Sequence, residues 1–438
     1  MPTETMNPKP TITLPAIPST TPTPAPKPTP KPTPIPTPTP APTPIWTIPV
    51  GDGTSWRALH MGGNWGTTRD AVNTMPEEYF EYVRDLNVNW VGISIALHVD
   101  GSMDSTVELQ YSGTQIPTFS DEVIIELVRA FRQHGFNVYF HIAFEGTGSG
   151  AYPFQRWQLG DPHAPDWDPD LLPEYWPWTP PHQDHQQFVA EFWQTYTEQL
   201  VHIAQIAETE GVGLLTLGTE TDRLFRSRSG GIWSNHFKNE MTAMVSAVRT
   251  VYSGLLGYEM HGNALVDRNY FGAGSDYLVA DLDLDVICVS AYFQLANVQQ
   301  NRVMSVQEFE AAWNVIFEQH LVPLKQRNGD RSIIFTEFGY VDSVGSPYLA
   351  SHDEFQNKLF RDKNENGLDD GEETQANCYE AFFNVMDSKP GVLEGAFLWG
   401  HQMATETQYA QSFAQMRTFS TRGKMAEAIV RARYEQWR

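Results

Sequence analysis

The chain has few cysteines, a shortage of basic residues and no long apolar run. Only 2 of its 438 residues are cysteine, and they form no Cys-x-x-Cys or Cys/His metal pattern. No apolar stretch reaches the roughly 18 residues that a membrane-spanning helix needs. There are 29 Lys and Arg against 53 Asp and Glu, which gives a formal net charge of −24. Such a charge disfavours nucleic acid and anionic lipid as partners and favours a neutral one.

The two cysteines are Cys288, inside the apolar run DVICVSAYF, and Cys378, in a helical pattern. We interpret both as buried free thiols; a disulfide between them is the alternative.

The N-terminal segment differs in kind from the rest of the chain. From Pro22 to Pro44, proline alternates with Thr, Ala, Lys and Ile, which excludes helix and central strand. Residues 1–45 are therefore predicted to be a disordered, Pro/Thr-rich linker that acts as a semi-rigid spacer; a proline-rich ligand for a partner domain is the alternative. A chain that starts Met-Pro-Thr before such a spacer resembles a secreted protein without its leader. We therefore expect an extracellular location.

Residues 46–438 have the length of one large (β/α)₈ barrel with insertions. Apolar runs predict eight strands, at residues 56–61, 89–97, 136–144, 213–219, 254–260, 284–292, 333–336 and 392–398. Helical patterns follow nearly all of them, at residues 76–86, 121–135, 185–210, 235–252, 306–324 and 423–437. The alternation predicts a parallel α/β fold, and the number of strands predicts a closed TIM barrel.

Two of the predicted strands end at a glutamate. LLTLGTETD delivers Glu220 from the fourth strand, and IIFTEFGY delivers Glu337 from the seventh. The carboxyl ends of barrel strands carry catalytic groups, and a pair of carboxylates at one mouth can hydrolyse glycosidic bonds. The alternative is that each glutamate is only a salt-bridge partner at a strand end.

Strand-four and strand-seven glutamates resemble those of the retaining (β/α)₈ glycosidases of clan A. Many families of that clan have Asn before the acid/base, whereas this chain has Thr219. Together with DVICVSAYF, IIFTEFGY and the GAFLWG ending, the sequence most resembles glycoside hydrolase family 113, the β-mannanases, over about residues 50–437.

The resemblance implies roles for four residues. Glu220 matches the acid/base and Glu337 the nucleophile. Tyr292 matches a tyrosine that hydrogen-bonds the nucleophile, and a phenol donor would keep that carboxylate ionised. Trp399 matches a tryptophan on which a sugar ring stacks. For Tyr292 and Trp399, packing at the barrel rim is the alternative.

Other residues lie at or near predicted strand ends that face the same mouth, where they could bind sugar hydroxyls or be structural. They are Asn64, Trp65, His98, His141, Glu145, Asp222 and His261. The long loop of about residues 146–184 is rich in Trp and Tyr and could line a glycan-binding cleft or pack on itself.

An independent motif occupies residues 362–373, DKNENGLDDGEE, which fits the EF-hand loop pattern. Flanking helices are predicted at residues 352–360 and 374–386. The pattern predicts a structural calcium ion; an acidic, solvated loop is the alternative. The predicted oxygen ligands are Asp362, Asn364, Asn366, the Leu368 carbonyl, Asp370 and Glu373.

The sequence thus predicts a monomeric, secreted, retaining endo-glycoside hydrolase that cleaves β-1,4-linked polysaccharide and uses no redox cofactor. The expected substrate is β-mannan. The same chemistry on cellulose or xylan is the nearest alternative. A non-catalytic carbohydrate-binding barrel and a calcium-dependent adhesion module are two others, but neither explains both strand-end glutamates.

Overall fold

A computed structural model describes residues 55–61, 69–99, 106–114, 116–146, 156, 159, 185–225, 237–266 and 282–438. The chain divides into two units, Met1–Thr43 and Pro44–Arg438. The predicted linker at residues 1–45 lies outside the described residues, all of which belong to the second unit. Within the described residues, no helix is both long and apolar enough to cross a membrane.

The second unit is built on a closed barrel of parallel strands in sequential order, β1 to β8, with β8 paired to β1. This confirms the predicted (β/α)₈ fold. The strands are β1 (Trp56–His60), β2 (Trp90–Val99), β3 (Asn137–Gly146), β4 (Leu214–Thr219), β5 (Leu255–His261), β6 (Val286–Ser290), β7 (Ser332–Phe338) and β8 (Gly395–Leu398).

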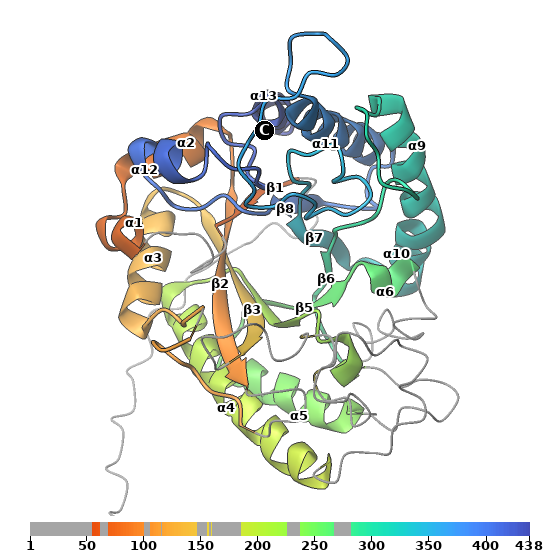
Figure 1. Cartoon of the computed structure of the whole chain (residues 1–438). Helices are drawn as coiled ribbons and strands as arrows, with labels where there is room; N and C mark the ends of the chain where they lie inside the picture. The colour runs from red at the N-terminus through yellow and green to blue at the C-terminus, as the bar shows by residue number, and fades with distance from the viewer. Residues whose placement is uncertain are drawn as a thin grey trace, which may run out of the picture. The chain divides into compact units, whose positions relative to one another are not determined.

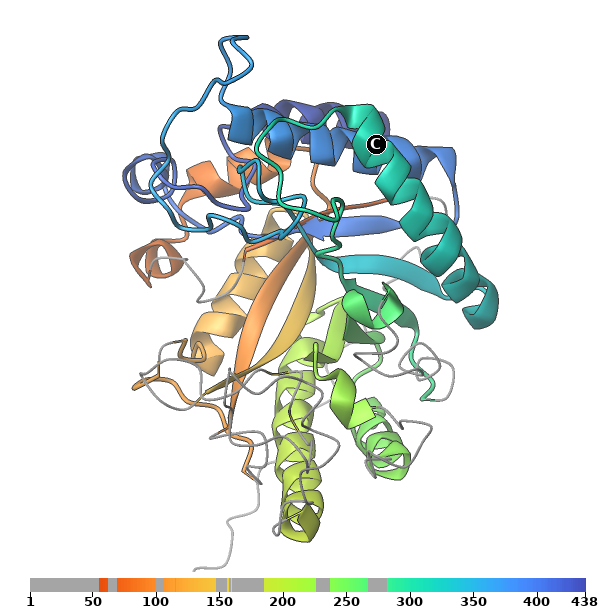
Figure 2. The ribbon, with the colours of Figure 1, turned by 45° about the vertical axis from the view of Figure 1, so that its right-hand side comes forward.

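Helices surround the strands, as both views of the ribbon show (Figures 1 and 2). They are α1 (Arg69–Thr74), α2 (Glu77–Asp85), α3 (Asp121–Gln133), α4 (His185–Glu210), α5 (Lys238–Arg249), α6 (Asn263–Val266), α9 (Val306–Ile316), α10 (Val322–Asn328), α11 (Asp370–Ser388), α12 (Glu406–Ser412) and α13 (Met425–Gln436). A π-helical turn, Phe317–Leu321, joins α9 to α10. The predicted helix at residues 306–324 is thus one continuous helical segment.

The barrel interior changes from apolar to polar along the strands. Near the strand starts, Trp56 stacks on Trp90 at 4.1 Å between ring centroids, and Phe397 packs edge-on against both. Because side chains alternate between the two faces of a strand, inward positions further along are two residues apart. On β5 these positions are Gly257, Glu259 and His261, the last two of which are polar. The polar layer therefore lies at the carboxyl ends of the strands, where a barrel presents its functional groups.

Two strands depart from regular pairing at the predicted glutamates. The β4–β5 register shifts between Thr216 and Thr219, and Glu220 follows with a left-handed φ of 55°. The register of β7 shifts against both β6 and β8 next to Glu337. Irregularities of this kind redirect side chains and are common next to active sites.

One predicted element is wrong. Residues 352–360 form turns and a bridge between Asn357 and Met416 instead of a helix. Asp353 and Phe355 have left-handed φ values of 64° and 59°, which interrupt any helix. The helix predicted at residues 374–386 is confirmed within α11. Cys288 and Cys378 are both buried free thiols, as predicted.

Candidate active site

Glu220 and Glu337 lie at the polar end of the barrel. Glu337 belongs to β7 and is buried. Glu220 directly follows β4, and its backbone N–H donates to the Glu259 carbonyl of β5 at 2.9 Å. That bond fixes the left-handed turn by which the chain leaves β4.

Both carboxylate oxygens of Glu337 have a partner. The Tyr292 hydroxyl, two residues beyond β6, donates to Oε2 at 2.8 Å. His141 Nε2 of β3 lies 2.9 Å from Oε1. Burial raises the pKa of Tyr292 well above its ordinary value, and the charge of Glu337 adds to the rise. The phenol therefore remains a donor, and donors on both oxygens orient the carboxylate and favour its ionised form.

Glu220 has a separate set of partners. The Ser290 hydroxyl, the last residue of β6, donates to its Oε1 at 2.6 Å. His261 Nε2, at the end of β5, lies 3.7 Å from the same oxygen. His261 is itself held in place, because its backbone N–H donates to Asp222 and its Nδ1 accepts from the Asn263 N–H, both at 3.0 Å.

A third carboxylate, that of Glu259 on β5, lies in the same polar end of the barrel and is fully buried. Its Oε2 accepts from the Tyr139 hydroxyl at 3.0 Å and from Thr219 Oγ1 at 3.1 Å, and it lies 3.2 Å from His141 Nε2. Sequence reasoning missed this residue. Its signal was a glutamate two positions before His261 in an otherwise apolar strand, on the inward-facing alternation.

The buried charges shift the pKa values of the two glutamates in opposite directions. Burial raises the pKa of Glu337, and the charge of Glu259 raises it further against the opposing effect of His141. Burial would also raise the pKa of Glu220. The positive charges of His261 and Arg156 outweigh burial and hold that pKa below its ordinary value.

Trp399 follows β8 and is partly buried. Its ring lies 4.4 Å from the His60 ring of β1 and 5.8 Å from the His141 ring, measured between centroids. The indole is thus next to the histidine that contacts Glu337, where a sugar bound at the site could stack.

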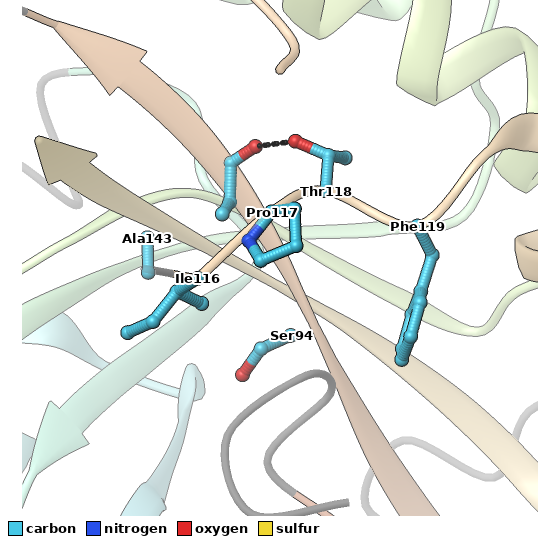
Figure 3. A pocket seen from close by; sticks show the side chains of 7 residues that line it. Ser94, Ile116, Pro117, Thr118, Phe119 and Ala143 are labelled. Carbon is cyan, nitrogen blue, oxygen red and sulfur yellow. Dashed lines mark hydrogen bonds between the residues drawn. The ribbon is translucent and has the colours of Figure 1, made fainter. Parts of the chain in front are cut away.

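His98 has other partners. Its Nε2 contacts the Ile116 carbonyl at 3.0 Å, and its Nδ1 accepts from the Gln110 N–H at 3.3 Å. It holds a segment that crosses β2 and β3, where Thr118 donates to the Ala96 carbonyl at 2.8 Å (Figure 3). The hollow under this segment, beside Ser94, has a volume of about 10 Å³, which suits one water molecule and not a sugar. We therefore assign His98 to the support of this segment.

Several predicted residues cannot be placed in the site. Asn64 and Trp65 lie outside the described residues, as does nearly all of the loop at 146–184. Within that loop, Arg156 is described and pairs with Glu145 of β3 at 2.9 Å.

A cavity of about 560 Å³ lies next to these groups, on the side of Asn263. It is lined by Asn263 and Val266 of α6, by the segment after β6 and by α9, and by none of the predicted site residues.

The comparisons with known proteins agree with this geometry. The family profile described as Glycoside Hydrolase Family 113 matches residues 180–424, more than half of the chain. The chain belongs to glycoside hydrolase family 113. It is therefore a glycoside hydrolase, and this confirms the resemblance and the enzyme class inferred from the sequence. No curated protein matches the chain.

Solved structures share the fold at low identity. A family 113 β-1,4-mannanase superposes with a TM-score of 0.59 at 17% identity, over 87% of this chain and 99% of its own. The family 113 β-mannanase of Alicyclobacillus acidocaldarius gives a TM-score of 0.57 at 17% identity, over 88% and 98%. A family 5 mannosidase from Rhizomucor miehei gives 0.53 at 8%, over 88% and 93%.

The predicted calcium loop of this family 113 chain folds as a compact turn that leads into α11. Gly367 has a φ of 84°, and the Asp362 carboxylate accepts from the Asn366 and Gly367 N–H groups at 2.9 and 2.8 Å. The side-chain amides of Asn364 and Asn366 both reach Glu373 Oε2, at 3.0 and 2.9 Å. Four of the predicted ligand side chains, including that of Asp362, are thus drawn into one turn.

The other two predicted ligand residues, Asp370 and Leu368, also make contacts within the loop. The Asp370 carboxylate accepts from the Lys363 N–H at 3.1 Å. The Leu368 N–H donates to Asn366 Oδ1 at 2.9 Å.

Replacing Tyr292 with Phe tests the site geometry. Loss of a hydrogen bond to a charged group costs about 1.5–3 kcal/mol, so kcat/KM on a polysaccharide substrate should fall about 10- to 100-fold. The phenol stabilises ionised Glu337, so its loss raises the pKa of that carboxyl. The acid limb of the pH profile should therefore move to higher pH.

The matched control is Tyr434→Phe on α13, whose hydroxyl donates to the Ala58 carbonyl at 3.1 Å at the opposite end of the barrel. It should alter the melting temperature without moving the acid limb. An unshifted acid limb in Tyr292→Phe would contradict the contact with Glu337.

Proposed function

We propose that this enzyme is a retaining endo-β-1,4-mannanase with Glu337 as nucleophile and Glu220 as acid/base. The observation that carries the assignment is the asymmetry of hydrogen bonding. Glu337 has a donor next to each oxygen, which fixes the orientation of the carboxylate, as suits a nucleophile. Among the described residues, Glu220 has one close donor, and its side chain is more exposed than that of Glu337, as suits a group that must gain and lose a proton.

In the first step, Glu337 Oε attacks the anomeric carbon while Glu220 transfers its proton to the departing glycosidic oxygen. The C–O bond to the leaving sugar breaks as the ester bond to Glu337 forms. In the second step, Glu220 takes a proton from water, whose oxygen attacks the same carbon and releases Glu337. His261 next to Glu220 and Trp399 at the mouth supply the polar and stacking contacts for the sugar.

The acid/base role requires a proton on Glu220, whereas His261 and Arg156 favour its ionised form in the free protein. Substrate binding can reverse this preference. The Glu220 side chain is 18% exposed and that of Glu337 6%, so a bound sugar removes more water from Glu220. Desolvation raises the pKa of a carboxyl. The pKa of Glu337 should rise less than that of Glu220 when a sugar binds, because both of its oxygens already have donors.

The choice of mannan is supported by the relatives named above, since the two family 113 structures are described as β-mannanases. Their identity to this chain is 17%, so cellulose and xylan remain the competing substrates. The formal net charge of −24 suits any of these neutral chains.

Reducing-sugar release from mannan, glucomannan, carboxymethylcellulose and xylan tests the proposal. The wild type should act on mannan and glucomannan, with a fall in viscosity that precedes most of the sugar release, as endo cleavage requires. Glu337→Gln should lose at least about 10³-fold in kcat, because no ester to the enzyme can form.

Two further variants complete the test. Glu220→Gln should lose activity on polysaccharide but keep the first step on an aryl glycoside whose leaving group needs no proton. Glu394→Gln, just before β8 at the far end of the barrel, should behave as wild type. Sugar release from cellulose or xylan alone would contradict the choice of mannan as substrate. Full activity of Glu337→Gln would contradict the role of Glu337 as nucleophile.

We also propose that the loop at 362–373 binds a structural Ca²⁺ through Asp362, Asn364, Asn366, Leu368, Asp370 and Glu373. The compact turn around Glu373 supports the proposal, since small rotations of the two Asn amides would present oxygen in place of nitrogen. The loop is anchored next to α11, where Asp369 accepts from the Gly371 and Glu372 N–H groups and from Arg417. The ion would steady this connection and take no part in the chemistry.

Calcium should raise the melting temperature by a few degrees over that measured in a chelator, because a ligand that binds only the folded state stabilises it. Glu373→Gln should lose this response. Glu365→Gln, in the same loop but outside the ligand positions, should keep it. An unchanged melting temperature in calcium would overturn the proposal.

An extracellular location is part of the same proposal. A polymeric substrate is met outside the cell, and the Pro/Thr-rich segment has the composition of a spacer that holds a catalytic domain away from a surface.

A further inference from the structure

The carboxylate of Glu259 has no place in the double-displacement steps, although it is more deeply buried than either reacting glutamate. Burying a third negative charge next to two others is costly unless a cation accompanies it. The group that can supply that cation is the His141 imidazole, whose Nε2 lies 3.2 Å from Glu259 Oε2 and 2.9 Å from Glu337 Oε1.

The other side of the imidazole is also satisfied. Its Nδ1 lies 2.8 Å from the Ser94 hydroxyl of β2, whose oxygen can accept a hydrogen bond from a protonated Nδ1. Both ring nitrogens thus lie next to oxygen atoms that can accept hydrogen bonds, an arrangement in which the doubly protonated imidazolium can donate from both.

The remaining contacts of Glu259 connect the two halves of the site. Its Oε2 accepts from Thr219, the residue before Glu220, and its backbone carbonyl accepts from the Glu220 N–H. One residue of β5 therefore holds the strand end that carries Glu220 and contacts the histidine that holds Glu337.

We propose that Glu259 is a positioning residue that keeps His141 protonated, so that the imidazolium holds Glu337 ionised and correctly oriented. This inference rests on the proposed function, since it assigns Glu337 the role of nucleophile. Glu259 itself touches no reacting atom. It acts by supplying the negative charge without which a fully buried imidazole would lose its proton.

The electrostatics agree with this geometry. Burial alone would lower the pKa of His141, but the carboxylates of Glu259 and Glu337 outweigh burial and raise it to about 9. The neighbouring His60 has its pKa lowered well below the ordinary value by burial and by the charge of His141, so it adds no cation. The titratable groups around His141 are His60 on β1, Tyr139 and Glu145 on β3, Glu220 after β4, Glu259 on β5 and Glu337 on β7.

The variant Glu259→Gln separates charge from hydrogen bonding. Its amide oxygen still accepts from Tyr139 and Thr219, but the negative charge is gone. The pKa of His141 should fall by about 1–3 pH units, and the His141 ring signals in NMR titration should report this directly. The measurement needs folded protein and no substrate, so it tests the inference even if the wild type proves inactive on every mannan.

The pH profile of kcat/KM gives the second readout. In Glu259→Gln, Glu337 loses a neighbouring negative charge, so its pKa falls and the acid limb moves to lower pH. His141 loses its proton at a lower pH than in wild type, so activity on the alkaline side also declines earlier. The whole profile should move toward acid, whereas His141→Gln should move the acid limb the other way.

Glu145→Gln is the matched control, because it removes another buried carboxylate of the same mouth that pairs with Arg156. It should leave the His141 titration close to wild type. Two results would overturn the inference: an unchanged His141 titration in Glu259→Gln, or an equal loss of kcat at every pH. Either would show that Glu259 only holds Tyr139 and Thr219 in place by hydrogen bonds. Inactive wild type with a shifted His141 titration would instead count against the proposed function alone.

Discussion

The contact of His141 Nε2 with two buried carboxylates, at 2.9 Å from Glu337 and 3.2 Å from Glu259, is the interaction on which the rest of the site depends. Three glutamates cannot all be ionised in the end of one barrel without a cation between them. The imidazolium supplies that charge from the barrel wall. The Tyr292 phenol holds the second oxygen of Glu337.

The barrel makes this arrangement possible because its interior is divided into layers. Stacked indoles and Phe397 fill the starts of the strands, so an apolar core lies at that end of the barrel. The polar end can then hold groups that are poor for stability but suited to chemistry. The irregular pairing at β4 and β7 aims Glu220 and Glu337 into this layer, and the left-handed backbone of Glu220 is the local cost of doing so.

Much of this could be predicted from the sequence. Apolar runs that alternate with helical patterns indicate the fold, and a glutamate that ends such a run has no packing purpose. Glu259 was not predicted as a site residue. A single carboxylate inside the strand LLGYEMH is marked only by its alternation with His261. The register shifts arise from pairing between strands far apart in sequence. The composition of residues 352–360 is compatible with the expected helix, but Asn357 pairs with Met416 in a β-bridge, which prevents a helix there.

Nuclear magnetic resonance of the first product released from mannan tests the central claim most directly. If Glu337 forms a covalent ester and Glu220 then activates water, the new reducing end appears first as the β-anomer and equilibrates later. Initial release of the α-anomer would mean a single displacement by water, and it would contradict the nucleophilic role of Glu337.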